Sequence, residues 1–175
     1  MSFFTKEKKK SNQNMVEQII LEKYNQYYRL AYSYVHNDMD ASDIVQNGAY
    51  RAIKNSHTLR QPEFAETWVY RIMLNEIFRY VKQPKYLSYE AILEEGSMDV
   101  GSKEDQYVNI DLQRALDALP DADKAIVILR FFEDMKIEEI ALVLDENVNT
   151  VKSRLYRSMK KMRITLSDDV HQNIG

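Results

Sequence analysis

The 175-residue sequence contains no cysteine, only four glycines and only three prolines. Without cysteine the chain can form neither a disulfide nor a thiolate metal site. The scarcity of glycine and proline disfavours β-rich folds and phosphate-binding loops, and it favours long helices with short connections. Long apolar runs are missing too, because no stretch approaches the roughly 20 residues that span a bilayer. The sequence therefore predicts an all-α, cytoplasmic protein that does not insert directly into a membrane.

Signatures of catalysis, of cofactor binding and of metal binding are also missing. The three histidines, His36, His57 and His171, lie in different segments of the chain. There is no zinc-protease motif, no P-loop and no serine-hydrolase motif. We therefore predict no enzyme activity, no cofactor and no metal ion.

The net charge of −3 is unevenly distributed along the chain. Residues 1–86 hold 13 basic and 9 acidic side chains, whereas residues 87–111 hold one basic and seven acidic side chains. Residues 149–166 hold six basic side chains and no acidic one. Two basic blocks on either side of an acidic middle indicate two contacts with an anionic ligand, held apart by a segment that repels it.

The spacing of apolar residues predicts helices in both halves of the chain. In order, we expect a mobile basic arm (1–14), two helices that meet near Glu22 (15–36), a helix capped by Asp38 or Asp40 (to about 55), a loop (55–62) and a helix (63–82). The second half is expected to hold an acidic linker (85–105), further helices (106–168) and a tail (169–175). The predicted architecture is two small helical domains, residues 15–84 and 106–168, joined by that linker.

The clearest motif lies near the C-terminus, where two helical patterns are separated by a short polar turn. A short helix with apolar residues at i, i+3, i+4 and i+7 begins at Ile137. In the turn, Asn147 is a candidate helix N-cap. The residues of the second helix that are predicted to face inward are Val151, Leu155, Met159, Met162 and Leu166. This is the pattern of a helix-turn-helix, which lays its second helix in the DNA major groove.

The outer side of that second helix is basic. A guanidinium group can read a guanine edge with two hydrogen bonds, at roughly 1–3 kcal/mol of discrimination, and lysines can hold phosphates without reading sequence. A solvated surface helix is the alternative, but such helices usually mix acidic and basic residues. The residues predicted to contact DNA here are Asn149, Thr150, Lys152, Ser153, Arg154, Arg157, Lys160 and Lys161.

A second candidate surface lies on the helix 63–82, whose buried side is expected to include Trp68 and Ile72. The opposite side is expected to carry Tyr70, Arg71, Leu74, Asn75, Phe78, Arg79 and Lys82. Cations interleaved with aromatic rings suit single-stranded nucleic acid, because phosphates pair with the cations and bases stack on the rings. The alternative is that Tyr70 and Phe78 pack on a neighbouring helix.

Segments 119–120, 128–132, 138–141 and 150–157 resemble region four of bacterial sigma factors of the extracytoplasmic-function (ECF) type. Segments 40–46 and 68–72, with Asn75, resemble region two of the same family. The resemblance implies that the second domain binds the minus-thirty-five promoter element. It also implies that the first domain binds the polymerase β′ clamp helices and opens the minus-ten element. An anti-sigma protein is a further partner that the resemblance implies.

The resemblance also assigns further residues to these contacts. The loop with His57 and Arg60 corresponds to the place where this family holds an extruded base. The residues assigned to core RNA polymerase are Asp40, Asp43, Gln46 and Asn47, although Asp40 also fits a simple helix-capping role.

The sequence departs from the family pattern at a few positions. Gly48 stands inside a predicted helix, at a cost of about 1 kcal/mol. Asp134 and Asp145 stand where a turn usually has glycine, and aspartate tolerates the left-handed backbone better than most residues do.

Two other functions fit the sequence. The chain could be a self-contained helix-turn-helix regulator, which would bind a palindromic site without polymerase. It could also be a helical protein-interaction module without DNA contact, in which case Arg154 and Arg157 would be dispensable.

Overall fold

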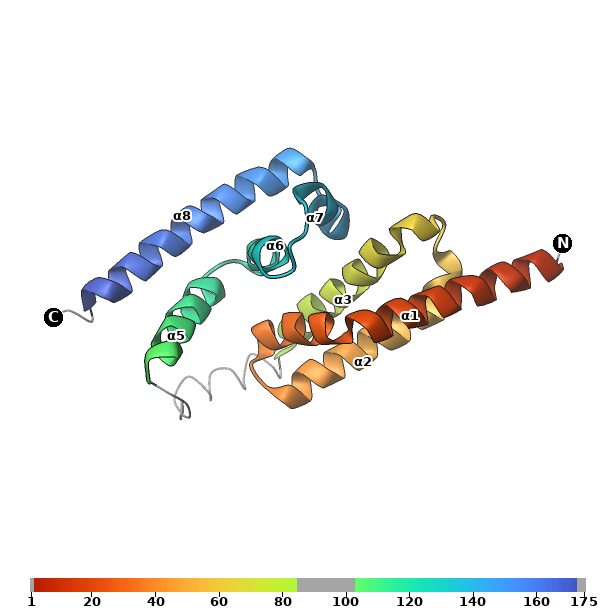
Figure 1. Cartoon of the computed structure of the whole chain (residues 1–175), viewed down its shortest axis with the longest axis horizontal. Coiled ribbons are helices and arrows are strands. Elements are labelled where there is room, and N and C mark those ends of the chain that lie inside the picture. The colour runs from red at the N-terminus through yellow and green to blue at the C-terminus, as the bar shows by residue number, and fades with distance from the viewer. Residues whose placement is uncertain (1, 85–102, 173–175) are drawn as a thin grey trace. The chain divides into compact units, whose positions relative to one another are not determined.

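The computed structural model describes residues 2–84 and 103–172, with side chains over 2–84 and 110–163. These residues form helices and short turns, with no strand among them. The chain divides into two compact units, Met1–Ser88 and Tyr89–Gly175 (Figure 1). The predicted fold class, two small all-α domains, is confirmed. Most of the predicted linker lies outside the described residues, and residues 103–105 belong to the helix α5 (Lys103–Asp117).

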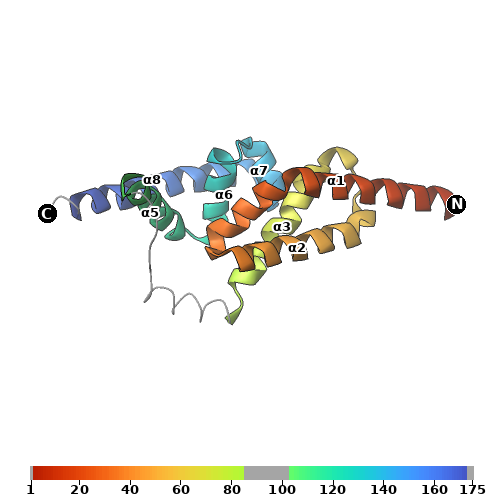
Figure 2. The same ribbon diagram turned by 60° about the horizontal axis from the view of Figure 1, so that its bottom comes forward.

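The first unit is built from three helices that contact one another pairwise. Its elements are α1 (Ser2–Val35), α2 (Asp38–Asn55), η1 (Ser56–Thr58), η2 (Pro62–Phe64) and α3 (Ala65–Val81). Figures 1 and 2 show α1 lying along both α2 and α3. The buried side chains at the centre include Val16, Tyr27, Leu30, Ile44 and Ile77.

The N-terminal end differs from the prediction in two ways. A single helix, α1, replaces the expected pair that met near Glu22, because residues 2–35 contain no glycine or proline that would end it. The expected mobile arm is wrong as well, since the same helix begins at Ser2 and Asn12 within it is buried.

The buried side of α3 also differs from the prediction. Trp68 and Ile72 are only partly buried, whereas Tyr70 and Leu74 are almost fully buried, at 2% and 1% exposed. The helix packs on both α1 and α2, so its buried surface is wider than a single apolar stripe.

Gly48 on α2 lies against Met73 on α3. A Cβ atom built on Gly48 would lie 2.4 Å from the sulfur of Met73, a side chain that is 1% exposed. The glycine therefore permits a close contact between the two helices, which offsets its poor helix propensity.

We expect Gly48→Ala to lower the free energy of unfolding by about 1 kcal/mol, because overpacking costs about 1–3 kcal/mol and the gain in helix propensity returns only about 1 kcal/mol. Urea unfolding followed by the fluorescence of Trp68, the only tryptophan in the sequence, reports on this unit. Asn47→Ala at the neighbouring, exposed position is the control, and it should be neutral or slightly stabilising. Equal stabilisation by both substitutions would contradict the close approach of Met73.

The second unit consists of α5, α6 (Asp121–Phe131), α7 (Ile137–Leu144) and α8 (Val148–Gln172). Helix α8 contacts α5, α6 and α7, and the buried residues of α6 include Ile126 and Leu129. Lys124 is also buried, and its ammonium group lies 2.6 Å from a carboxylate oxygen of Asp117. This ion pair joins α5 to α6 and satisfies a charge that would otherwise be costly to bury.

Two predictions for α8 need correction. Met159, expected to face inward, is 42% exposed, and Ser158 is buried in its place. The expected tail at 169–175 starts inside the helix, which continues to Gln172. In the described part of the chain, no helix is both long enough and apolar enough to cross a bilayer.

Candidate nucleic-acid interface

The helix-turn-helix forms through local signals that the sequence carries. Helix α7 ends at Leu144, and the next residue, Asp145, adopts the left-handed conformation (φ 55°). The N–H of Glu146 donates to the carbonyl of Ala141 at 2.9 Å. The Asn147 side chain then accepts a hydrogen bond from the N–H of Asn149 at 2.8 Å. The predicted N-cap and the predicted left-handed aspartate are both confirmed, and Asp134 also has a positive φ.

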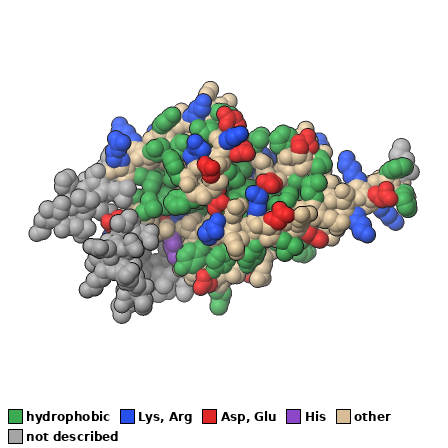
Figure 3. All heavy atoms as spheres, viewed as in Figure 1, with side chains coloured by type: hydrophobic (Ala, Val, Ile, Leu, Met, Phe, Trp, Pro, Cys, Tyr) green, Lys and Arg blue, Asp and Glu red, His purple; other side chains and the backbone are tan. Residues whose placement is uncertain are grey.

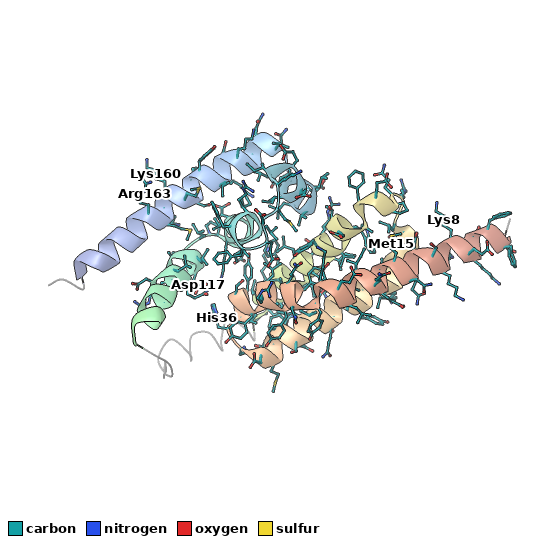
Figure 4. All side chains as sticks on the ribbon, in the orientation of Figure 1. Lys8, Met15, His36, Asp117, Lys160 and Arg163 are labelled. Atoms are coloured by element: carbon teal, nitrogen blue, oxygen red, sulfur yellow. The ribbon has the colours of Figure 1, made fainter. Side chains whose placement is uncertain are left out.

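The second helix of the motif, α8, turns its apolar residues inward and leaves its basic residues outside. Val151 and Leu155 are buried, whereas the polar and basic residues predicted to contact DNA are exposed, apart from Arg154. The exposed residues are Asn149, Thr150, Lys152, Ser153, Arg157, Lys160 and Lys161. Figure 4 shows Lys160 projecting from α8, with Arg163 close by on the same helix.

Arg154 has a more complex environment than its neighbours. It is partly buried, and its guanidinium group lies 3.5 Å from a carboxylate oxygen of Asp123 on α6 and 3.5 Å from one of Glu146 in the turn. The basic side of α8 therefore does have acidic partners, although none lies on α8 between Asn149 and Ser167. Arg154 therefore links the turn to α6 through these two ion pairs, and part of its side chain remains accessible to solvent.

Lys161 also has a structural contact, because its ammonium group donates to the carbonyl oxygen of Ala118 at 3.0 Å. That carbonyl lies just after the C-terminal end of α5, where cations are favourable against the helix dipole. Lys161 therefore links α8 to α5, and a phosphate would have to compete with this contact.

On α3, the residues predicted to contact DNA divide by exposure. Those residues are Tyr70 (buried), Arg71 and Phe78 (partly buried), and Asn75, Arg79 and Lys82 (exposed).

Tyr70 lies in the core and not on the outer side of α3, so its predicted role in stacking on bases is wrong. Its ring meets that of Tyr27 edge-on at a centroid distance of 4.9 Å, and its hydroxyl donates to Gln26 at 3.2 Å. Phe78 packs edge-on against Tyr34 at 6.1 Å, so the alternative of packing on a neighbouring helix also applies there. A ring held in this way contributes about 0.5–1.5 kcal/mol beyond its burial.

Glu76 on α3, which the sequence analysis did not single out, forms ion pairs with two arginines, one on α2 and one on α3. Its carboxylate is 8% exposed and accepts hydrogen bonds from Arg79 at 2.7 and 2.8 Å. The same carboxylate lies 2.9 Å from Nε of Arg51 on α2. Two guanidinium groups share one carboxylate, so the cluster keeps a positive charge on the outside of the unit, where an anionic strand can reach it.

Elements η1 and η2 form the loop between α2 and α3. His57 and Arg60 are both exposed there, and the His57 Nδ1 atom lies 3.1 Å from the carbonyl oxygen of Lys54. These are the two loop residues that the family resemblance assigned to an extruded base.

The side of α2 assigned to polymerase contains one residue with a structural role. Asn37 is the N-cap of α2, in place of the predicted aspartates, and it exchanges hydrogen bonds with Asp40 at 2.7 and 2.8 Å. Burial raises the pKa of the Tyr80 phenol, and a hydrogen bond to Asp40 raises it further. Asp40 is therefore not the helix cap that its alternative role supposed, and its carboxylate instead accepts hydrogen bonds from the Asn37 side chain and from Tyr80.

The other three residues assigned to polymerase, Asp43, Gln46 and Asn47, are exposed on α2. At the start of the same helix, Asp38 accepts a hydrogen bond from Tyr28, which raises the pKa of that phenol to about 12.

The sequence matches two family models, one in each unit. The model of sigma-70 region 2 matches residues 19–85, and the model of sigma-70 region 4 matches residues 109–162. The RNA polymerase sigma factor SigV of Bacillus subtilis is 41% identical over 164 residues, which cover 93% of this chain and 97% of that protein. The chain belongs to the sigma-70 family of RNA polymerase sigma factors.

Other relatives of this sigma factor are named as ECF sigma factors. The ECF sigma factor SigW of Bacillus subtilis is 28% identical over 93% of this chain and 95% of that protein. The ECF sigma factor SigE of Mycolicibacterium smegmatis is 30% identical over 84% of this chain and 60% of that protein.

Two solved structures share the fold at 20% identity. The sigma factor RpoE of Bartonella quintana, in complex with the anti-sigma factor NepR, superposes with a TM-score of 0.64 over 86% of this chain and 96% of that chain. CnrH, in complex with the cytosolic domain of CnrY, superposes with a TM-score of 0.67 over 94% of this chain and 96% of that chain.

Proposed function

We propose that this sigma factor binds core RNA polymerase in the cytoplasm and directs it to promoters, where the two units have separate roles. The second unit binds the minus-thirty-five element through the exposed side of α8. The first unit binds the polymerase β′ clamp helices through α2, and it binds the opened minus-ten element through α3 and the loop. The chain itself catalyses no reaction in this proposal.

The observation that carries the proposal is the presence of both sigma regions, in order, one in each compact unit. The exposed basic residues of α8 support the assignment to double-stranded DNA, because cations and guanidinium groups bind phosphates and guanine edges. The Arg51–Glu76–Arg79 cluster and the exposed Lys82 support the assignment of α3 to a single strand.

Tyr70 is buried and Asp40 is held by Asn37, so neither belongs to the proposed contacts. For the minus-thirty-five element they are Asn149, Thr150, Lys152, Ser153, Arg157 and Lys160, with Arg154 and Lys161 shared between DNA and the protein. For the minus-ten element they are His57, Arg60, Arg71, Asn75, Phe78, Arg79 and Lys82. For polymerase they are Asp43, Gln46 and Asn47.

An anti-sigma protein belongs to the proposal as a partner. Of the two solved structures that share the fold, one is a sigma factor crystallised with an anti-sigma factor, and the other is CnrH in complex with the cytosolic domain of CnrY. We expect such a partner to cover surfaces used for polymerase or DNA.

Run-off transcription tests the proposed function. Core RNA polymerase is incubated with a library of upstream sequences, with and without this protein. We expect transcripts that start at defined promoters and depend on the protein. A self-contained regulator would instead bind a palindromic site without polymerase, and a protein-interaction module would give no specific transcript in either case.

Asp43 and Asp40 provide a matched pair for the polymerase contact. We expect Asp43→Ala to weaken binding to core polymerase about tenfold, or roughly 1.4 kcal/mol, with no change in stability, because Asp43 is exposed. Asp40→Ala is expected to lower the free energy of unfolding by about 1–2 kcal/mol, because it removes the carboxylate that accepts hydrogen bonds from the Asn37 side chain and from the Tyr80 hydroxyl. Affinity for immobilised core polymerase and urea unfolding separate the two effects. Unchanged affinity of Asp43→Ala would remove α2 from the proposed contact.

A further inference from the structure

The loop between α2 and α3 is attached to the N-terminal part of α1 through one buried side chain. The amide nitrogen of Asn12 donates to the carbonyl oxygens of Ser56, at 3.3 Å, and of Leu59, at 3.0 Å. Asn12 is 4% exposed, and Ser56 and Leu59 are buried as well. A hydrogen bond from the N–H of Leu59 to the carbonyl of Ser56 closes the turn, at 3.2 Å. One amide group therefore holds both ends of the turn that presents His57.

Asn12 lies outside the part of the chain that the family model covers, which begins at residue 19, whereas Ser56 and Leu59 lie within it. The first turns of α1 continue past the loop, as both views of the ribbon show (Figures 1 and 2). Because α1 is continuous and is fixed by Asn12, residues 2–11 are held at a set position relative to the loop.

Helical spacing places two lysines on the same side of α1 as Asn12. Lys9 precedes Asn12 by three residues and Lys8 precedes it by four, so both lie one turn beyond the contact with the loop. Lys6 and Lys10 precede it by six and two residues, which places them toward the opposite side of the helix. All four lysines are exposed. Figure 3 shows basic side chains at this projecting end, and Figure 4 labels Lys8 there.

We propose that Lys8 and Lys9 form a phosphate-binding site that extends the loop, and that Asn12 is the positioning residue of this site. The ligand is the backbone of single-stranded promoter DNA that leads away from the base held at His57 and Arg60. The site rests on the proposed function, because the loop must hold that strand. Two ammonium groups one turn beyond the loop suit neighbouring phosphates, which they bind without reading sequence.

An anionic membrane is the other ligand that this end of the helix could bind, because Phe3 and Phe4 are 72% and 80% exposed beside the lysines. The attachment to the loop favours DNA. A membrane anchor needs no fixed position relative to the loop, whereas a phosphate contact next to a bound base does.

The test measures how the binding of polymerase to DNA depends on salt. Core polymerase with the full-length sigma factor binds a fork-shaped promoter DNA whose minus-ten element is single-stranded. For single strands the slope of log K against log salt is about −0.7 per phosphate contact. We expect the double variant Lys8→Gln/Lys9→Gln to reduce the slope by about 1.4 and to weaken binding at low salt. Lys6→Gln/Lys10→Gln removes the same charge from the other side of the helix, and it should leave the slope unchanged.

Asn12→Ala tests the positioning role. In the Asn12→Ala background, the Lys8→Gln/Lys9→Gln change should alter the slope much less than it does in the native protein. Far-ultraviolet circular dichroism and retention on core polymerase verify that each variant is folded. Should Asn12→Ala fail to fold, Asn12→Asp provides a second variant, because it keeps the size of the side chain but loses the amide donor.

The possible outcomes are distinct. If the native protein directs no promoter-specific transcript, the proposed function fails. If it directs initiation but both lysine pairs give the native slope, or equal reductions, only the phosphate site fails. Binding of the free protein to phosphatidylglycerol vesicles that depends on Lys8 and Lys9, with an unchanged slope on DNA, would overturn the proposal in favour of a membrane surface.

Discussion

Arg157→Ala is expected to reduce transcription from a promoter that this sigma factor recognises by about 5- to 150-fold. The side chain is exposed on α8, beyond the helix-turn-helix turn, and a guanidinium group that reads a guanine contributes about 1–3 kcal/mol. Binding to core polymerase should be unchanged, because the proposed contact with the clamp lies in the other unit. Run-off transcription and retention on immobilised core polymerase measure the two activities separately.

The matched control is Arg114→Ala, which removes one exposed arginine of the same unit from α5. It should leave promoter use close to the native level. Arg154→Ala should differ from both, because it also breaks the contacts with Asp123 and Glu146 and therefore lowers stability as well as promoter use. Loss of polymerase binding in Arg157→Ala would contradict separate roles for the two units.

The sequence predicted the helix-turn-helix well, because the signals that form it are local. Asn147 caps the helix that begins one residue later, and Asp145 adopts the left-handed conformation at the end of the preceding helix. Such signals act over a few residues, so they can be recognised without knowledge of the rest of the fold.

The sequence predicted long-range partners poorly, because they come from other helices. The absence of acidic residues between Asn149 and Ser167 suggested a bare cationic surface, yet Asp123 on α6 reaches Arg154 from 31 positions away in the sequence. Asn12 is a similar case. It lies in a polar, lysine-rich stretch, a composition that predicts exposure to solvent. Its partners Ser56 and Leu59 are more than 40 residues further along the chain.

The side of α3 was misassigned for a different reason. A helix that packs against one neighbour has one apolar stripe, but α3 packs against both α1 and α2. Tyrosine is compatible with both the core and the surface, because its ring is apolar and its hydroxyl is polar. The packing of α3 against its neighbours, including the contact of Tyr70 with Tyr27 on α1, places Tyr70 inside.

Tyr70→Ala is accordingly expected to lower the free energy of unfolding of the first unit by about 3–5 kcal/mol, the usual cost of removing a buried aromatic side chain. It deletes a ring that is 2% exposed and that packs against Tyr27, and it leaves a cavity between α1 and α3. Because native domains are stable by only about 5–15 kcal/mol, this loss should bring the unit close to unfolding at 37 °C. Urea unfolding followed by Trp68 fluorescence provides the measurement.

Tyr70→Phe distinguishes packing from DNA binding at this position. It keeps the ring and removes only the hydroxyl, whose partner Gln26 is partly exposed and can bind water instead, so the expected cost is about 1 kcal/mol. A stacking residue on the surface would give the opposite pattern, because Tyr70→Ala would then remain as stable as the native protein and lose promoter opening. Stability and opening of a fork promoter, measured on the same two variants, therefore decide whether Tyr70 acts by packing in the core or by stacking on DNA. That result also bears on Arg79 and Lys82, because they can bind a strand only if the helix is held on the core by residues such as Tyr70.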